Sequence, residues 1–239
     1  MVDDQHDGWG GQMLIPLLFG ESLLPLSPDS VHIWQLPLLE LQPDFLSVDE
    51  RVRAARFRFD QDRMRWRNAR SMLRQCLAQY VKHTPESLRF GYTTHGKPFL
   101  ADHPEITFNL SHAGDYGLLA VTCGRQVGVD IELVRPDFAD PAVAWHFFSD
   151  AEQSQLAHLA TEKYTIAFFT CWTRKEAYIK ARGEGLSHPL KDFDVSIQSD
   201  SCNLLLSTRP NESEALNWHV QAVKVPDGYL GAVATSMRD

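Results

Sequence analysis

The chain has few cysteines and no long hydrophobic run. Its 239 residues include four cysteines, and none of these forms a CxxC pair: Cys76, Cys123, Cys171 and Cys202. Widely spaced cysteines predict neither a zinc site nor a disulfide framework and are typical of a reduced, cytoplasmic protein. The apolar stretch 13–19 contains Pro16 and follows acidic residues, so we expect no signal peptide. No later run is long enough to cross a membrane.

Positive charge is also scarce, except in one segment. The formal net charge is −8, yet residues 51–74 hold nine arginines and two aspartates, a local charge of +7. These nine arginines are called the arginine cluster below: Arg51, Arg53, Arg56, Arg58, Arg63, Arg65, Arg67, Arg70 and Arg74. A basic segment on an acidic protein indicates a local polyanionic ligand. The alternative is a solvated helix face whose arginines pair with nearby aspartates.

Hydrophobic periodicity predicts an α+β protein. Ser47 and Glu50 form a capping-box pattern that begins a helix, and residues 61–81 carry an apolar stripe at helical spacing. Strands are expected at 31–36, 88–92, 106–110, 117–123, 127–133, 193–197, 217–225 and 229–235. Further helices are expected at 141–147, 150–159 and 162–181.

This order of strands and helices occurs twice, which predicts two similar, pseudo-duplicated lobes with a cleft between them. The short segments 117–123 and 230–235 resemble each other, and each ends its half of the chain. We expect a disordered tail over residues 1–12, an N-terminal lobe over 13–125 and a C-terminal lobe over 126–239.

Two acidic residues alternate in the expected strand 127–133. On a strand, Asp130 and Glu132 share a face and lie about 6.6 Å apart along the chain, which is close enough to share a cation. Oxygen ligands without neighbouring histidine pairs or cysteines favour Mg²⁺ over Zn²⁺. The alternative is a polar strand face that is open to solvent.

A third carboxylate lies on the expected helix 162–181. Phe169, Trp172 and Glu176 recur at three- and four-residue spacings, so Glu176 and Lys180 are expected on or beside the face that is turned to the interior. A carboxylate in that position needs a partner, which Lys180 supplies four residues further on. The alternative is an ordinary surface pair of the same spacing.

The segment 108–112 places a serine beside a histidine. Ser111 and His112 are neighbours on an expected strand and point to opposite faces, which argues against a nucleophile and its base. Ligand binding is the expected role of the pair. A structural histidine is the alternative.

Four motifs follow one another along the chain: GKP at 96–98, FNLSH at 108–112, GVDIE at 128–132 and WTRKEAYIK at 172–180, with GEGL at 183–186 after them. Together they resemble the Sfp-type (surfactin-synthetase-activating) 4′-phosphopantetheinyl transferases over roughly residues 30–235. The resemblance implies two similar α+β lobes with coenzyme A in the cleft. It also implies an enzyme that moves phosphopantetheine from coenzyme A to a serine of an apo carrier protein (acyl, peptidyl or polyketide) and releases 3′,5′-ADP.

The resemblance also implies which residues bind the metal and coenzyme A. Asp130, Glu132 and Glu176 would hold Mg²⁺ against the pyrophosphate of coenzyme A. Lys180 would bind the pyrophosphate and offset the charge of the leaving group. The residues at the adenosine end would be Arg53, Lys97, Ser111 and His112, with His112 and Arg53 at the 3′-phosphate.

Two glutamates are candidates for the base. Glu152 lies in a stretch that resembles the family's FSxxE motif. Either Glu176 or Glu152 would accept the serine proton, directly or through a metal-bound water. The segment 147–152 should flank the metal site, so we also expect an apolar docking contact for the carrier there, centred on Phe148.

The sequence also bears on the partners of the protein and on two alternative functions. We expect a monomer with no nucleic-acid or membrane partner. A Mg²⁺-dependent hydrolase of a nucleotide diphosphate could use the same carboxylates with water in place of serine. A nucleic-acid-binding module built on the arginine cluster is the other alternative, and the acidity of the rest of the chain counts against it.

Overall fold

The structure is a computed structural model that describes residues 12–15, 25–40, 42–198 and 204–238. Its first sheet has the strand order β1-β2-β6-β5, and its second sheet has the order β10-β11-β7. The strands of the first sheet are β1 (Gln12–Ile15), β2 (Val31–Pro37), β5 (Ile106–Ala113) and β6 (Tyr116–Cys123). Those of the second are β7 (Val127–Leu133), β10 (Trp218–Ala222) and β11 (Tyr229–Ser236).

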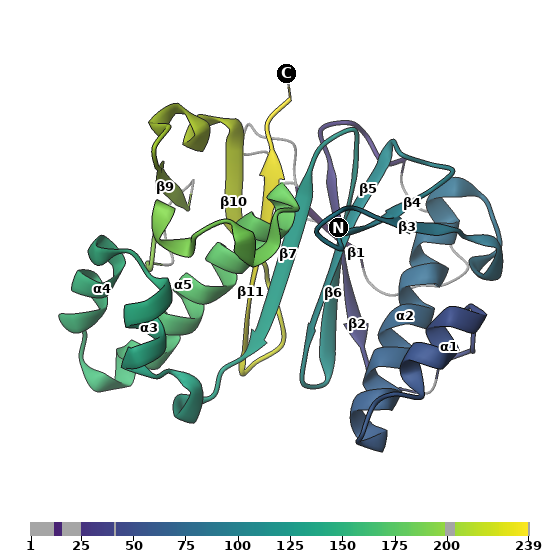
Figure 1. Ribbon diagram of the computed structural model, residues 1–239, viewed down its shortest axis with the longest axis horizontal. Coiled ribbons are helices and arrows are strands. Elements are labelled where there is room, and N and C mark those ends of the chain that lie inside the picture. Colours follow the sequence, from purple (N-terminus) through teal and green to yellow (C-terminus); the bar gives the residue numbers. More distant parts are fainter. Residues whose placement is uncertain (1–11, 16–24, 41, 199–203, 239) are drawn as a thin grey trace, which may run out of the picture.

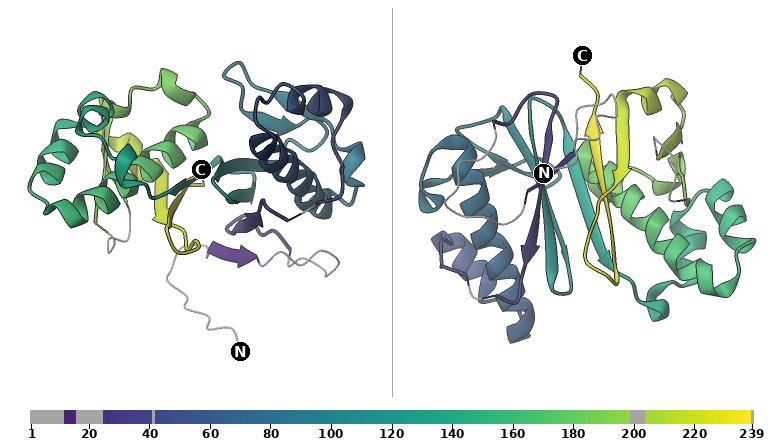
Figure 2. Two further views of the ribbon diagram at one scale, coloured as in Figure 1. Left: turned by 90° about the horizontal axis from the view of Figure 1, so that it is seen from below. Right: turned by 180° about the vertical axis from the view of Figure 1, so that it is seen from behind.

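One long helix covers each sheet. In Figure 1, α2 (Asp60–Val81) lies outside the first sheet, α5 (Thr161–Arg182) lies outside the second, and the two sheets meet between them. Figure 2 shows the same arrangement from below and from behind. The shorter helices are α1 (Val48–Ala54), α3 (Pro141–Phe147) and α4 (Asp150–Ala157). Two small hairpins pair β3 (Phe90–Tyr92) with β4 (Pro98–Leu100) and β8 (Phe193–Val195) with β9 (Leu205–Thr208).

Three large apolar cores hold the sheets and the long helices together, and a small cluster of Leu46, Ala54 and Trp66 attaches α1 to α2. Trp34 and Leu36 of β2 pack in the core under α2, whereas Val31 and Ile33 of the same strand pack against the second sheet. This alternation follows from the two-residue period of a strand. The third core lies between α5 and the second sheet. The two helix-covered sheets confirm the expected α+β class with two similar lobes.

The same alternation determines where the acidic residues of β7 point. Val127, Val129 and Ile131 are buried between the two sheets. Gly128, Asp130 and Glu132 lie on the opposite face, which α5 covers. The predicted shared face of Asp130 and Glu132 is therefore an interior face. Asp130 is 2% exposed, which excludes the alternative of a solvent-facing strand for that residue.

Several expected boundaries differ from the observed ones. The strand expected at 88–92 begins at Phe90, and the one expected at 217–225 is Trp218–Ala222. The short strands β4 and β9 were not predicted because three or four residues carry too little periodicity. Residues 1–11 of the expected tail lie outside the described residues, and Gln12 begins β1 rather than ending that tail.

No described helix combines the length and the hydropathy that a membrane-spanning segment requires.

Close contact between β7 and α5 requires glycine at position 128. A Cβ atom there would lie 2.2 Å from both the carbonyl oxygen of Ala177 and the amide nitrogen of Ala181. We expect Gly128→Ala to force the strand away from the helix and to lower the free energy of unfolding by about 3 kcal/mol, measured by urea denaturation. Gly96→Ala is the control, because it has nothing within 4 Å and only a positive φ of 82°. It should cost about 1 kcal/mol. Equal losses in the two variants would contradict the close-contact explanation.

Candidate functional site

The acidic face of β7 meets α5 and β5 at a buried cluster. Asp130 Oδ1 accepts hydrogen bonds from Lys180 Nζ at 2.5 Å and from Ser111 Oγ at 2.8 Å. Lys180 Nζ also lies 3.1 Å from Ser111 Oγ and 3.9 Å from Glu176 Oε2. We call Ser111, Asp130, Glu132, Glu176 and Lys180 the acidic site. Residues from both sheets and from α5 therefore contribute to one cluster. The sequence grouped Asp130, Glu132, Glu176 and Lys180, whereas Ser111 was expected at the adenosine end of coenzyme A.

Asn109 connects β7 to the first sheet. Its Oδ1 accepts a hydrogen bond from the backbone amide of Val129 at 2.9 Å. Because β7 is an edge strand, this amide has no strand partner on that side. Ser111 lies two residues after Asn109 and so points in the same direction, toward Asp130. The FNLSH motif thus places Ser111 through the side chain of Asn109.

Burial raises the pKa of all three carboxyl groups. It raises the pKa of Asp130, against the charge of Lys180, and it also raises the pKa of Glu176. Burial and the neighbouring charge of Asp130 raise the pKa of Glu132 to about 7. Burial opposes the charge of Lys180, but Asp130 and Glu176 raise its pKa on balance. Three carboxyl groups thus face one ammonium group, which leaves the cluster short of positive charge.

One atom of the cluster indicates how this shortage would be met. Asp130 Oδ2 is buried and has no hydrogen-bond partner among the described residues. A buried carboxylate oxygen without a donor is costly, and a divalent cation that prefers oxygen ligands would satisfy it. In the described part of the chain, no three acidic, histidine or cysteine side chains already stand at coordinating positions. The donor set, Asp130 with Glu132 and Glu176, fits Mg²⁺ in its chemistry.

Trp172 was missed as a site residue by the sequence reasoning. Its side chain hydrogen-bonds the carboxylate of Glu132, which lowers the pKa of that group against the effect of burial. Trp172 also packs edge-to-face on Phe147, with ring centroids 5.6 Å apart. The apolar stripe of the helix predicted Trp172 as a packing residue, and only the fold shows that its indole also acts on Glu132.

His112 lies on the opposite side of β5 from Ser111, as expected for neighbours on a strand. Partial burial lowers the pKa of His112, and the charges of Lys180 and Arg65 lower it further. Arg65 forms an ion pair with Asp115, in the turn just after β5. Among the arginine cluster, Arg65 is thus the member whose charge acts on His112. No motif in the sequence distinguished it.

Most of the arginine cluster is paired within the protein. Six members form ion pairs with acids: Arg51 and Arg67 with Asp44, Arg63 with Asp60, Arg65 with Asp115, and Arg70 and Arg74 with Glu50. Arg53 instead lies 5.6 Å from the Trp66 ring and lines a groove of about 430 Å³ with Arg89 and Tyr92. For these six arginines, the alternative holds in which they pair with acidic residues of the protein itself.

Lys97 does not contact the carboxylates of the acidic site. Its Nζ donates hydrogen bonds to the carbonyl oxygens of Val127 at 3.0 Å and Ala181 at 2.9 Å. Burial lowers the pKa of Lys97 to about 8. The side chain therefore crosses from the β3–β4 hairpin to the second sheet and α5.

Glu152 is not available as a base in this structure. Its side chain is completely buried, and its Oε1 accepts a hydrogen bond from the Val195 amide at 2.8 Å. Its Oε2 accepts from the Ser149 amide and lies 2.8 Å from Lys175 Nζ. The assignment of Glu152 to catalysis is wrong here, because both oxygens are used in the interior. Phe148 is also 0% exposed, so the expected docking contact at that residue is wrong as well.

Sequence comparisons now identify the family. Residues 126–234 match the model of the 4′-phosphopantetheinyl transferase superfamily, and residues 36–124 match that of the 4′-phosphopantetheinyl transferase N-terminal region. The chain belongs to the 4′-phosphopantetheinyl transferase superfamily. The expected enzyme class, a transferase that moves phosphopantetheine from coenzyme A to carrier proteins, is confirmed.

Individual relatives extend over most of the chain. The 4′-phosphopantetheinyl transferase HetI of Nostoc is 34% identical over 223 residues, which cover 89% of this chain and 90% of HetI. The 4′-phosphopantetheinyl transferase psf-1 of Bacillus pumilus is 35% identical over 82% of this chain and 81% of its own length. The 4′-phosphopantetheinyl transferase Sfp of Bacillus subtilis is 29% identical over 82% of this chain and 84% of its own length.

The buried pairs of Glu50 provide a test of the arginine cluster. Glu50→Ala leaves Arg70 and Arg74 buried without an anion, and we expect it to lower the free energy of unfolding by about 3–5 kcal/mol. The control, Arg51→Ala, removes a more exposed pair with Asp44 and should cost at most about 1 kcal/mol. Urea denaturation measures both variants, and a loss of similar size in the two would contradict the structural role.

The pH dependence of this contribution has a defined sign. Burial alone would raise the pKa of Glu50, but Arg70, Ser47 and Arg74 lower it on balance. The stabilisation is therefore fully present above the ordinary carboxyl pKa and is lost as the pH falls through the lowered value. Wild type should lose this part of its stability on acidification, whereas Glu50→Ala has none to lose.

Proposed function

We propose that the acidic site binds the pyrophosphate of coenzyme A together with Mg²⁺ and activates the carrier serine there. The observation that carries this assignment is the buried cluster of Asp130, Lys180 and Ser111, in which Asp130 Oδ2 lacks a partner. Asp130, Glu132 and Glu176 would hold the metal. When bound, Mg²⁺ would neutralise charge on the pyrophosphate oxygens.

Lys180 is the cation that the chain itself supplies to the reaction. Its Nζ lies 2.5 Å from Asp130 Oδ1, and its side chain is 29% exposed, so it reaches the surface of the cluster. An ammonium group held in this position stabilises the charge that develops on the leaving 3′,5′-ADP. Ser111 contributes by fixing Asp130, to which its hydroxyl donates.

Glu176 is our candidate for the base. Its side chain is 16% exposed, whereas that of Glu152 is completely buried. A base must come within hydrogen-bond reach of the proton that it accepts. Of the two glutamates that the motifs suggested, only Glu176 has a surface that a serine hydroxyl can approach. The serine oxygen then attacks the β-phosphorus of coenzyme A as its proton passes to Glu176.

The adenosine end of coenzyme A is assigned to the N-terminal lobe, residues 13–125. Arg53 and Arg89 line one groove with Tyr92, Asp49 and Glu86. Arg89 is paired with Asp102, so Arg53 is the arginine that we assign to a phosphate group there. His112, beside the charge of Arg65, would bind the 3′-phosphate together with Arg53. The C-terminal lobe, residues 126–239, supplies most of the acidic site.

Oligomeric state and compartment follow as further parts of the proposal. Both lobes that build the site come from one chain, so a monomer suffices as the active unit. The widely spaced cysteines suit a reducing cytoplasm, and no nucleic-acid or membrane partner is required for the reaction.

A transfer assay tests the proposed function directly. The protein is incubated with coenzyme A, Mg²⁺ and an apo carrier protein, and the intact carrier is weighed by mass spectrometry. We expect the carrier to gain one phosphopantetheine group. Asp130→Ala should lower kcat about 100-fold or more because it removes an oxygen ligand. Glu176→Gln should do the same because it removes the negative charge and the proton acceptor of that side chain. The control is Glu162→Gln, an exposed residue at the other end of α5.

Three results would count against this assignment. Release of 3′,5′-ADP without modification of the carrier would support a hydrolase that uses the same carboxylates. Near-normal turnover by both site variants, with melting temperatures like that of wild type, would exclude the cluster as the catalytic centre. Loss of activity in Glu162→Gln as well would indicate a general disruption of the helix.

The 3′-phosphate assignment is tested with dephospho-coenzyme A. Wild type should bind this ligand about tenfold more weakly than coenzyme A, because it lacks a charge-assisted contact. Arg53→Ala and His112→Ala should each lose most of that preference in isothermal titration calorimetry. Arg58→Ala, an exposed member of the arginine cluster outside the groove, should keep it. Full discrimination by the first two variants would mean that other residues bind the phosphate.

A further inference from the structure

The β3–β4 hairpin of the first lobe extends to the end of α5. Its turn is closed by hydrogen bonds from the Thr93 amide to the Lys97 carbonyl at 2.9 Å and from the Gly96 amide to the Thr93 carbonyl at 2.9 Å. The Lys97 amide also donates to Thr93 Oγ1 at 3.1 Å. In Figure 1 the loop between β3 and β4 lies beside β7. These hydrogen bonds hold the backbone of Lys97 in a defined position, from which its side chain extends toward α5 and β7.

The two acceptors of Lys97 belong to α5 and β7, two of the three elements that form the acidic site. Ala181 lies in the last turn of α5, where carbonyl groups have no partner within the helix. An ammonium group is favourable there because it also faces the negative end of the helix dipole. The second acceptor, the Val127 carbonyl, is at the first residue of β7. One side chain therefore ties the end of α5 to the start of β7.

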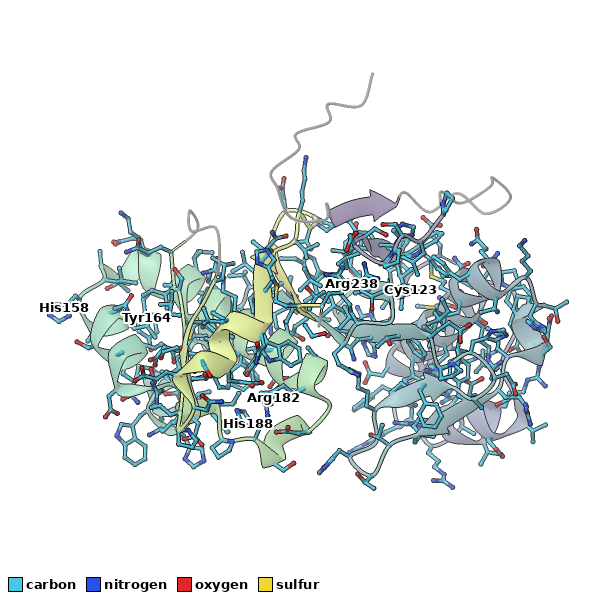
Figure 3. All side chains as sticks on the ribbon, turned by 90° about the horizontal axis from the view of Figure 1, so that it is seen from above. Cys123, His158, Tyr164, Arg182, His188 and Arg238 are labelled. Carbon is cyan, nitrogen blue, oxygen red and sulfur yellow. The ribbon has the colours of Figure 1, made fainter. Side chains whose placement is uncertain are left out.

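Two further features place the hairpin close to this end of α5. Gly183 ends the helix with a φ of 76°, and a Cβ there would lie 3.3 Å from Lys97 Cδ. His95 Nδ1 lies 3.4 Å from Ser187 Oγ in the loop that follows. Figure 3 labels Arg182 and His188, which lie close together in this region. The hairpin therefore contacts the helix end through Lys97 and the segment after it through His95.

The two carbonyl groups that bind Lys97 lie close in sequence to the ion pair of Lys180 and Asp130. Ala181 directly follows Lys180, and Val127 lies three residues before Asp130. Any movement of α5 along β7 would change the 2.5 Å contact between Lys180 and Asp130. Two of the three donors of the Lys97 ammonium group are used in holding that register.

We infer that Lys97 is a positioning residue, which sets Lys180 against Asp130 by bonding the carbonyls of Ala181 and Val127. This role replaces the expected contact of Lys97 with the adenosine end of coenzyme A. The expected effect of Lys97 on kcat rests on the proposed function of the acidic site. Its expected effect on the stability of the α5 end does not. A misplacement of about 1 Å far from the reacting atoms can lower a rate on the order of 100-fold, so loss of the tie should reduce kcat.

The test uses Lys97→Met, which keeps the aliphatic stem and removes the ammonium group. Hydrogen exchange followed by mass spectrometry should show residues 176–183 exchanging about tenfold faster than in wild type, because the helix end loses its anchor. In the transfer assay, kcat should fall about tenfold while the KM for coenzyme A changes by less than about threefold. Lys163→Met, an exposed lysine at the other end of α5, is the matched control and should change neither quantity.

Two more variants separate positioning from ligand binding. Lys97→Arg can donate to both carbonyls and should restore slow exchange and most of kcat, which also shows whether a failure of Lys97→Met is a folding failure. In a Lys180→Ala background, Lys97→Met should lower kcat by less than about twofold, because the group that it positions is gone.

Each contrary result has a definite meaning. Unchanged exchange together with a KM for coenzyme A raised about tenfold or more and an unchanged kcat would overturn the inference, since that is the pattern of a ligand contact. Additive losses with Lys180→Ala would overturn it as well. If wild type transfers nothing, the proposed function fails. The exchange measurement then still decides the inference, with faster exchange in Lys97→Met supporting it and unchanged exchange overturning it.

Discussion

The ion pair between Asp130 and Lys180 joins β7 to α5 at the centre of the acidic site. Asp130 is 2% exposed, so its charge has lost nearly all contact with water. Taking such groups from water is expensive, and a simple buried pair often stabilises a protein no better than apolar side chains would. Burying three carboxyl groups and one lysine where β7 meets α5 therefore lowers the stability of the folded protein. An anionic substrate with its cation would offset that cost when it binds.

The same arrangement attaches a short helix to the long helix in both lobes: a capping box whose glutamate forms an ion pair. Ser47 and Glu50 form a capping box at the start of α1, and Glu50 pairs with Arg70 and Arg74 of α2. Ser149 and Glu152 form the same box at the start of α4, and Glu152 pairs with Lys175 of α5. In both lobes a buried capping glutamate therefore binds a cation on the long helix. This agreement supports duplication more strongly than the short similarity between strand segments.

The sequence predicted elements and shared faces better than it predicted partners. The two-residue period placed Asp130 and Glu132 together, and helical spacing placed Glu176 beside Lys180, because both are local properties of the backbone. The role of Glu152 depended on what lies opposite it, which spacing does not reveal. Yet its serine three residues earlier repeats the pattern that was correctly interpreted at Glu50. The ion-pair partners of the arginine cluster could not be predicted for the same reason. Composition gives the number of charges, but it does not show which acidic side chain lies opposite each arginine.

What distinguishes the two lobes is the face that each sheet presents to its long helix. In the first lobe, Trp34 and Leu36 of β2 pack apolar surface under α2. In the second, β7 presents Gly128 and two carboxylates to α5. Glycine allows the helix to come close, and closeness is what lets a lysine side chain reach a carboxylate on the strand. The two lobes thus share a scaffold, and the second lobe has a buried polar strand face where the first has an apolar one.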